Sequence, residues 1–231
     1  MELQDIRLDP AAETYRRNEL RDLREWVTAN ADLEPPTTLE IGSNRGRFLS
    51  ELAQLNPDES LLGFEWQRKW ARLANKSLVK AGISNARVLS ADANLALPLI
   101  YPDATIARVF ILFPDPWWKR RHAKRRLFTP AFLQLLAAKI RGDGLLLIKT
   151  DVEPYAEYLE ALLSTIPQFQ LLSDGDPFYP EDETQWPRTT RERKIISEGL
   201  PVWKFYLRRT GLVALPPEEQ ETPEPSRFLK P

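Results

Sequence analysis

Short apolar runs and stretches with one apolar face follow each other in a regular order along most of the chain. The apolar runs predict strands near residues 37–42, 61–65, 86–89, 109–113, 144–150, 169–172 and 202–209. Apolar residues at helical spacing predict helices after residue 46, over 67–81, from Pro130 onward and over 153–165. Because strands alternate with helices, the pattern predicts an α/β fold: a seven-stranded, mostly parallel sheet with helices on both faces. The polar, proline-containing stretch between the last two strands is predicted to be a loop.

The two ends of the chain differ from this central pattern. Residues 11–29 predict one helix, in which four apolar positions form a stripe and several arginines lie mostly off it. Pro35 and Pro36 then mark the entry to the main domain. From Pro216 the chain is rich in proline and glutamate and has little to bury. We therefore expect a basic helical extension over residues 1–36, the main domain over 37–210, and a disordered tail over 211–231.

Composition excludes several classes of function. The 231 residues include no cysteine, which rules out disulfides and thiol nucleophiles, and one histidine, His122, so neither a metal site nor a serine–histidine triad is expected. No apolar stretch is long enough for a membrane span or a signal peptide, so we expect a soluble, cytoplasmic protein without a membrane partner. The net charge is −1, but six cations fall within the eight residues 119–126. Such a run is more often a solvated surface than a binding site.

Acidic residues and a glycine follow the predicted strands at the point where each strand ends. Because the carboxyl ends of parallel strands meet at one edge of a sheet, these residues should gather there. They are Glu40, Gly42, Glu65, Asp92, Asp115 and Asp151.

The first of these positions belongs to a glycine-containing turn, Glu40-x-Gly42-x-Asn44-x-Gly46. Its spacing matches neither a dinucleotide fingerprint nor a phosphate-binding loop with Gly-Lys-Ser/Thr. It resembles the first motif of Rossmann-like S-adenosylmethionine-dependent methyltransferases, with Asn44 in place of the usual second glycine. Asparagine tolerates positive φ better than other non-glycine residues, so the turn can form.

Two more carboxylates extend this interpretation. Glu65 closes the second strand, where a carboxylate can accept hydrogen bonds from both ribose hydroxyls. Asp92 follows the third strand, where such methyltransferases contact the adenine amino group. The alternative for each is a solvated acid that caps the next helix.

The segment from Phe113 to Arg126 is the most specific in the chain. Pro114 and Pro116 stiffen the backbone on both sides of Asp115, and two tryptophans and the cationic run follow. A rigid acid beside aromatic and cationic side chains suits a site that receives an RNA base.

With these residues in view, the chain resembles the bacterial tRNA (guanine-N7)-methyltransferase family from roughly residue 39 to 208. The resemblance rests on Phe113-Pro-Asp-Pro-Trp117-x-Lys119-x-x-His122-x-Lys124-Arg-Arg126, on Thr150-Asp151-x-x-Pro154-Tyr155, and on Thr189-x-x-Glu192 before a Gly-x-x-x-Trp strand. It implies a Rossmann-like class I methyltransferase fold, S-adenosylmethionine as cofactor, and tRNA as partner. The implied reaction is methylation of a guanosine in the tRNA variable loop.

The resemblance also implies roles for individual residues. Glu40, Gly42, Glu65, Asp92 and Asp115 would bind the cofactor, and Asp115 would also be the catalytic residue. The substrate positions would be Lys119, Asp151, Thr189 and Glu192, although Thr184 lies near Thr189 and is an alternative match. Two other functions stay open: an RNA-binding module with a degenerate cofactor pocket, and a methyltransferase of the same fold with another substrate. The sequence leaves monomer and homodimer equally open.

Overall fold

The computed structural model describes residues 21, 23–29, 34–117, 126–176, 179 and 186–211. Within them lies one seven-stranded sheet of strand order β3-β2-β1-β4-β5-β7-β6. The strands from β3 to β5 are parallel, and β7 is antiparallel to both of its neighbours. The strands are β1 (Thr38–Ile41), β2 (Leu61–Glu65), β3 (Ala86–Ser90), β4 (Ile106–Leu112), β5 (Ile140–Thr150), β6 (Phe169–Leu171) and β7 (Trp203–Arg209). This confirms the predicted mostly parallel sheet.

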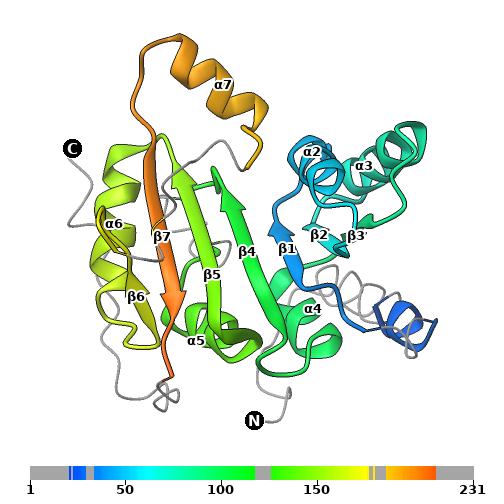
Figure 1. The fold of residues 1–231 in the computed structure, drawn as a ribbon, viewed down its shortest axis with the longest axis horizontal. Helices are drawn as coiled ribbons and strands as arrows, with labels where there is room; N and C mark the ends of the chain where they lie inside the picture. The colour runs from blue at the N-terminus through cyan, green and yellow to red at the C-terminus, as the bar shows by residue number, and fades with distance from the viewer. Residues whose placement is uncertain are drawn as a thin grey trace.

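Helices cover both faces of the sheet, as predicted (Figure 1). One apolar core lies between one face and α4, α5 and α6, and includes Leu97, Leu133 and Leu159. The second core lies between the other face and α2 and α3, and includes Leu52 and Leu78. The helices are α2 (Arg47–Leu55), α3 (Arg68–Lys80), α4 (Ala93–Ile100), α5 (Pro130–Lys139), α6 (Glu153–Leu163) and α7 (Thr190–Ser197).

Two helices and one strand start differ from the sequence prediction. The helix α4 contains Pro98, which removes an internal hydrogen bond and hides the helical pattern in the sequence. The helix α7 lies in the stretch that was predicted to be a loop, because its exposed polar residues leave little apolar periodicity. The strand β5 begins at Ile140, directly after α5, and so precedes the predicted start at Gly144.

The N-terminal segment is helical where the structure describes it, at residue 21 and over 23–29. Leu23 is 3% exposed, and Trp26 and Val27 pack against the core. This short helix therefore docks on the sheet domain. Residues 118–125, with Lys119 and His122, and residues 212–231 of the predicted tail lie outside the described part. Nowhere in the described ranges is there a helix long and apolar enough to cross a membrane.

Candidate functional site at the carboxyl edge of the sheet

The turn after β1 has the backbone that its residues permit. Gly42, Asn44 and Gly46 have φ angles of 87°, 48° and 70°, so the predicted tolerance of Asn44 for a left-handed conformation is confirmed. A Cβ at Gly46 would lie 2.8 Å from the Cβ of Ala74 in α3, whereas a Cβ at Gly42 would meet nothing within 4 Å. Gly46 thus packs the turn against α3, and Gly42 leaves open space on the outer side of the turn.

Glu65 at the end of β2 ties this turn to the start of α3. One carboxylate oxygen accepts a hydrogen bond from the backbone N–H of Asn44 and the other from that of Gln67, each at 2.8 Å. Each oxygen has a second lone pair, so the carboxylate retains acceptor capacity for two hydroxyl groups. The geometry is compatible with the predicted ribose site.

Glu40 lies inside β1 and is 4% exposed. Its Oε2 atom has no hydrogen-bond partner among the described residues. Burial raises the pKa of the Glu40 carboxyl to about 7, the Ser43 hydroxyl opposes this shift, and the charge of Glu65 adds to it. A buried carboxylate with an unpartnered oxygen is a site for a cationic group, because a positive charge would compensate both the burial and the missing hydrogen bond.

Asp92 is the N-cap of α4, where its side chain accepts a hydrogen bond of 2.9 Å from the backbone N–H of Asn94. The helix-capping role that the sequence analysis gave as an alternative for Asp92 is therefore confirmed. It does not compete with a contact to an adenine amino group, because a carboxylate has about four acceptor positions.

Asp115 lies exposed in the loop that leaves β4. Phe113 begins this loop with a positive φ of 55°, and its N–H still donates to the Lys149 carbonyl of β5. The Arg126 guanidinium donates to the carbonyl of Trp117 at 3.2 Å, which ties the described ends on either side of residues 118–125 together. The Asp115 side chain is therefore held on a strained, anchored backbone beside β5.

Asp151 follows β5 and pairs with Arg191 of α7. The Arg191 Nε atom lies 3.1 and 3.0 Å from the two carboxylate oxygens, and Nη2 lies 2.8 Å from Oδ2. The same guanidinium lies 5.8 Å from the centre of the Phe113 ring. The pair thus connects the Asp115 loop, the end of β5 and the start of α7.

Thr189 and Glu192 form a capping box at the start of α7. The Thr189 hydroxyl accepts from the Glu192 N–H at 3.0 Å, and the Glu192 carboxylate accepts from the Thr189 N–H at 3.4 Å. The same carboxylate lies 2.6 Å from the Lys149 ammonium, with side-chain exposures of 2% and 5%. Both predicted substrate residues therefore hold α7 in place, and Glu192 is almost fully buried.

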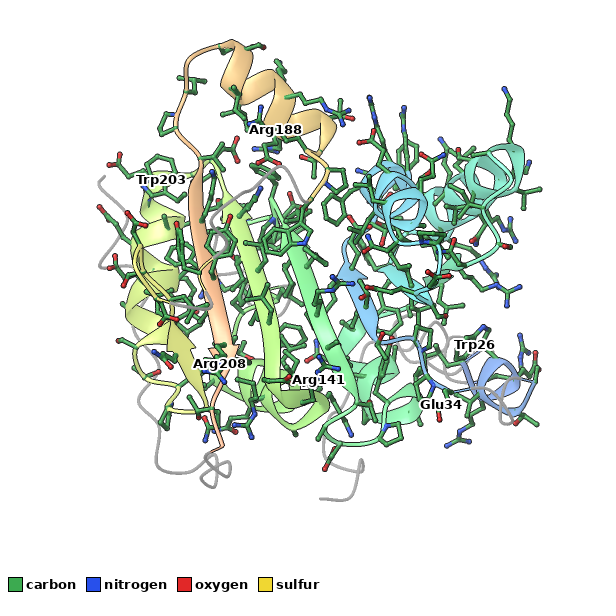
Figure 2. The ribbon with its side chains drawn as sticks, viewed as in Figure 1. Trp26, Glu34, Arg141, Arg188, Trp203 and Arg208 are labelled. Atoms are coloured by element: carbon green, nitrogen blue, oxygen red, sulfur yellow. The ribbon has the colours of Figure 1, made fainter. Side chains whose placement is uncertain are left out.

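The helix α7 also contacts α2, which begins at the end of the glycine turn. Arg193 pairs with Glu51, and Arg47 donates to the Thr190 hydroxyl at 3.4 Å. Burial opposes the shift, but the hydrogen bonds from Arg193 and Arg47 lower the pKa of Glu51. Figure 1 shows α7 beyond the ends of β4 and β5, and Figure 2 places Arg188 there and Arg141 at the opposite end of the sheet.

The site therefore has two parts that meet at the carboxyl edge. Glu40, Gly42 and Glu65 form the part expected to hold S-adenosylmethionine, and their open lone pairs fit a ligand that has cationic groups and hydroxyls. Asp115, Asp151, Thr189 and Glu192 lie around β4, β5 and α7, and Lys119 lies outside the described residues. The described residues contain no cluster of three or more metal-ligating side chains.

The sequence pattern did not identify two residues of the site, Lys149 and Arg191. Lys149 had a usable signal, because a lone cation inside the apolar run 145–150 must find a partner when it is buried. Arg191 had no comparable signal, since its contact with Asp151 depends on the position of α7.

Comparisons with known proteins agree with this architecture. A family model described as "Putative methyltransferase" matches residues 34–205. A tRNA (guanine-N7)-methyltransferase from Myxococcus xanthus is 38% identical over 172 residues, which are 74% of this chain and 82% of the relative. The enzyme of that name from Marinobacter nauticus is 36% identical over 173 residues, which are 75% and 72% of the two chains.

A solved structure supports the fold independently. The SAM-dependent O-methyltransferase of Thermotoga maritima superposes with a TM-score of 0.50 at 12% identity, over 84% of this chain and 67% of that one. The sheet order and the two covered faces are therefore those of a class I methyltransferase fold.

Proposed function

Because the chain belongs to the bacterial tRNA (guanine-N7)-methyltransferase family, we propose that its carboxyl-edge site methylates N7 of a guanosine in the variable loop of tRNA. The cofactor is S-adenosylmethionine. The observation that carries the proposal is the meeting of two sets of carboxylates at one edge: Glu40 and Glu65 beside the glycine turn, and Asp115 and Asp151 beside β4 and β5.

The cofactor half is assigned by the acceptor capacity of each group. Glu65 receives the ribose hydroxyls, and Asp92 the adenine amino group. The open side of Gly42 admits the cofactor chain close to the backbone. Glu40, whose buried oxygen lacks a partner, compensates the positive charge of the cofactor. When bound, S-adenosylmethionine supplies a methyl group on a sulfonium, which is transferred to a nucleophile with an available lone pair.

The guanine half is assigned by complementarity. Guanine presents N1–H and an amino group as donors and O6 as an acceptor. Asp151 retains a lone pair on Oδ1 for one of these donors while Arg191 holds its carboxylate, and the remaining N–H groups of the same guanidinium can donate to O6. Adenine has an acceptor at N1, a donor amino group at C6 and no amino group at C2, so this arrangement favours guanine.

The N7 lone pair of guanine is free, so no general base has to remove a proton. The requirements are alignment of N7 with the methyl group and stabilisation of a ring that becomes cationic. Asp115 meets the second requirement, because its carboxylate lies on an anchored loop at the edge of the sheet, where it can face the ring. We therefore assign Asp115 a role in orientation and electrostatics.

The target base must leave its stack, which costs roughly a few kcal/mol. The cations of residues 119–126, Lys119 among them, offset part of this by holding the phosphates, whose contacts fix register and not sequence. Since tRNA is the partner, we also infer a cytoplasmic location.

The test is transfer of labelled methyl from S-adenosylmethionine to unmodified tRNA, followed by reductive aniline cleavage to locate the product. We expect one cleavage, at a variable-loop guanosine. Asp115→Ala should lose about a hundredfold in turnover, typical for a preorganised electrostatic contact, while it keeps tRNA binding.

Other results would separate the alternatives. Methyl transfer without cleavage at that guanosine would support the assigned cofactor and contradict the assigned target. Binding of tRNA without binding of cofactor would favour an RNA-binding module with a degenerate pocket. Unchanged turnover in Asp115→Ala would remove Asp115 from the mechanism.

A further inference from the structure

The helix α3 is strongly basic over its whole length. Among the thirteen residues Arg68–Lys80 there are five cations and no acid. Arg68, Arg72, Lys76 and Lys80 follow one another at intervals of four, so they form one row with a rise of about 6 Å per step. All four are exposed, and the opposite side of the helix is apolar and packs on the sheet. This row is hereafter the α3 basic row.

This charge pattern opposes the stability of the helix. Like charges four residues apart destabilise a helix by about 0.2–0.5 kcal/mol per pair, and the row contains three such pairs. Arg68 and Lys69 also lie in the first turn, where the helix dipole disfavours cations. Within the described residues, Arg72, Lys76 and Lys80 have no ion pair that would compensate. Because this row of cations is unfavourable for the helix, it points to a role in binding an anionic partner.

The helix is fixed rigidly to the cofactor half of the site. Gln67, its N-cap, donates to Glu65, and the turn at Gly46 packs directly on Ala74. Asn75 is anchored to β3 by two hydrogen bonds with the backbone of Val88, of 2.7 and 2.9 Å. A charged group bound to α3 is therefore held at a set position relative to the cofactor.

An aromatic ring orders the cations at the site end of the helix. The Arg45 guanidinium lies 4.6 Å, and the Lys69 ammonium 5.2 Å, from the centre of the Trp70 ring. Arg45 comes from the glycine turn itself, so the positive surface continues from α3 to the cofactor turn. Cation–π contacts restrict both side chains before any ligand arrives.

The opposite side of the sheet has the reverse charge. The helix α6 contains Glu153, Glu157 and Glu160 and no cation. Figure 1 shows α3 and α6 on opposite sides of the molecule. The net charge of −1 thus hides a separation of charge that attracts a polyanion to the α3 side and repels it from the α6 side.

We propose that the α3 basic row is a second docking surface for the substrate tRNA, which contacts the phosphate backbone outside the target nucleotide. The inference rests on the proposed function. A helix of thirteen residues spans about 20 Å, which is enough to follow several phosphates of a tRNA arm. Because phosphate contacts set register, the row would orient tRNA so that the target base faces the cofactor.

The experiment compares the triple variant Arg72→Gln/Lys76→Gln/Lys80→Gln with the wild type. Each phosphate contact contributes about 0.7–0.9 to the slope of log binding constant against log salt, so the variant should lose about 2–3 units of slope. We expect a KM for tRNA about tenfold higher, with kcat at saturating tRNA and S-adenosylmethionine affinity unchanged. The substitutions remove like-charge repulsion, so the variant should fold at least as stably as the wild type.

The control is Glu153→Gln/Glu157→Gln/Glu160→Gln on α6, which shifts the net charge by the same amount in the opposite direction. If only the total charge mattered, the α6 variant would strengthen tRNA binding by as much as the α3 variant weakens it. We expect the α6 variant to leave the salt slope unchanged. An unaltered slope and KM in the α3 variant of an enzyme that methylates tRNA would overturn this inference alone. A wild type that does not methylate tRNA would instead overturn the proposed function.

Discussion

Glu40 is the residue whose ionisation opposes folding and favours the cofactor. Its pKa is about 7 in the folded protein because of burial, against an ordinary value of 4.5. The unfolded chain therefore ionises first, and the contribution of this carboxyl to stability is full below pH 4.5 and is lost as pH rises to about 7. Glu40→Gln should raise the free energy of unfolding of the cofactor-free protein by up to about 3 kcal/mol at about pH 8, and should have no such effect near pH 4.5. Chemical denaturation at the two pH values measures this.

The same substitution should have the opposite effect on the cofactor. A cationic ligand favours the ionised carboxylate, so wild-type affinity for S-adenosylmethionine should rise about fivefold to tenfold from about pH 6 to about pH 7.5. Glu40→Gln should bind more weakly and lose this pH dependence, as calorimetric titration would detect. Equal stability and equal affinity in the two proteins at all pH values would show that neither folding nor cofactor binding depends on the charge of Glu40.

Arg191 holds the Asp151 carboxylate by a fork of hydrogen bonds, and its side chain is 54% exposed. An exposed ion pair usually contributes only about 0–1 kcal/mol to stability, so Arg191→Ala should leave the melting temperature nearly unchanged. If Arg191 positions Asp151 for guanine, kcat should fall about tenfold while S-adenosylmethionine affinity stays the same. Arg191→Lys should rescue little, because an ammonium cannot form the fork. Steady-state kinetics with tRNA as the varied substrate gives kcat and KM separately.

A matched control lies on the same helix. Lys194 pairs with Glu198 at 3.7 Å and is exposed, so Lys194→Ala removes a cation of α7 that does not contact Asp151. Its kcat should equal that of the wild type. Equal values for Arg191→Ala and Lys194→Ala would make the Arg191–Asp151 contact an ordinary surface pair.

At the scale of elements, α7 depends on a buried ion pair at its start. Lys149 and Glu192 are nearly inaccessible, so removal of one partner leaves an uncompensated buried charge and costs about 3–5 kcal/mol. Lys149→Met should therefore destabilise the protein by that amount. The double variant Lys149→Met/Glu192→Gln should recover most of the loss, because glutamine can also complete the capping box with Thr189. Urea denaturation of the three proteins tests this.

The double variant also separates the two roles of Glu192. If the carboxylate contacts guanine as well as Lys149, the stable double variant should still transfer methyl groups about tenfold more slowly than the wild type. Recovery of full activity together with stability would limit Glu192 to holding α7.

The sequence predicted the elements that are held by apolar burial, and it missed α7, which is held by several polar contacts. The strands β1 and β2 are buried along their whole length, so their apolar runs were sufficient. The helix α7 is held by a capping box, by a buried ion pair, and by ion pairs to Asp151 and Glu51. Only the capping-box residues, Thr189-x-x-Glu192, form a local sequence pattern, and that pattern was interpreted as a substrate motif. The Asp115 loop was located correctly, but its link to α7 through Phe113 and Arg191 depends on tertiary structure.

At the scale of the molecule, the order of strands decides which residues meet. The alternation of strand and helix patterns predicted a parallel sheet with the acids at strand ends along one edge. The strands β1, β4 and β5 are indeed neighbours in the sheet. The position of β7 between β5 and β6 could not be predicted, because an antiparallel insertion leaves the local apolar pattern of a strand unchanged. This insertion brings the chain back past the site and places α7 beyond β5.

The position of β7 also predicts how much of the C-terminus the fold requires. β7 forms backbone hydrogen bonds with strands on both sides and ends at Arg209, so the sheet is complete before the Pro- and Glu-rich segment begins. A chain that ends at residue 215 should melt within about 2 °C of the full-length protein and keep its methyl transfer rate, since a small local change shifts the melting temperature little. A chain that ends at residue 202 lacks β7 and should not fold, because β5 and β6 would lose their shared partner. Thermal unfolding and labelled-methyl transfer on both truncations provide the measurement. If the chain that ends at residue 215 kept its melting temperature but lost most of its methyl transfer, the C-terminal segment would instead have a direct part in binding tRNA.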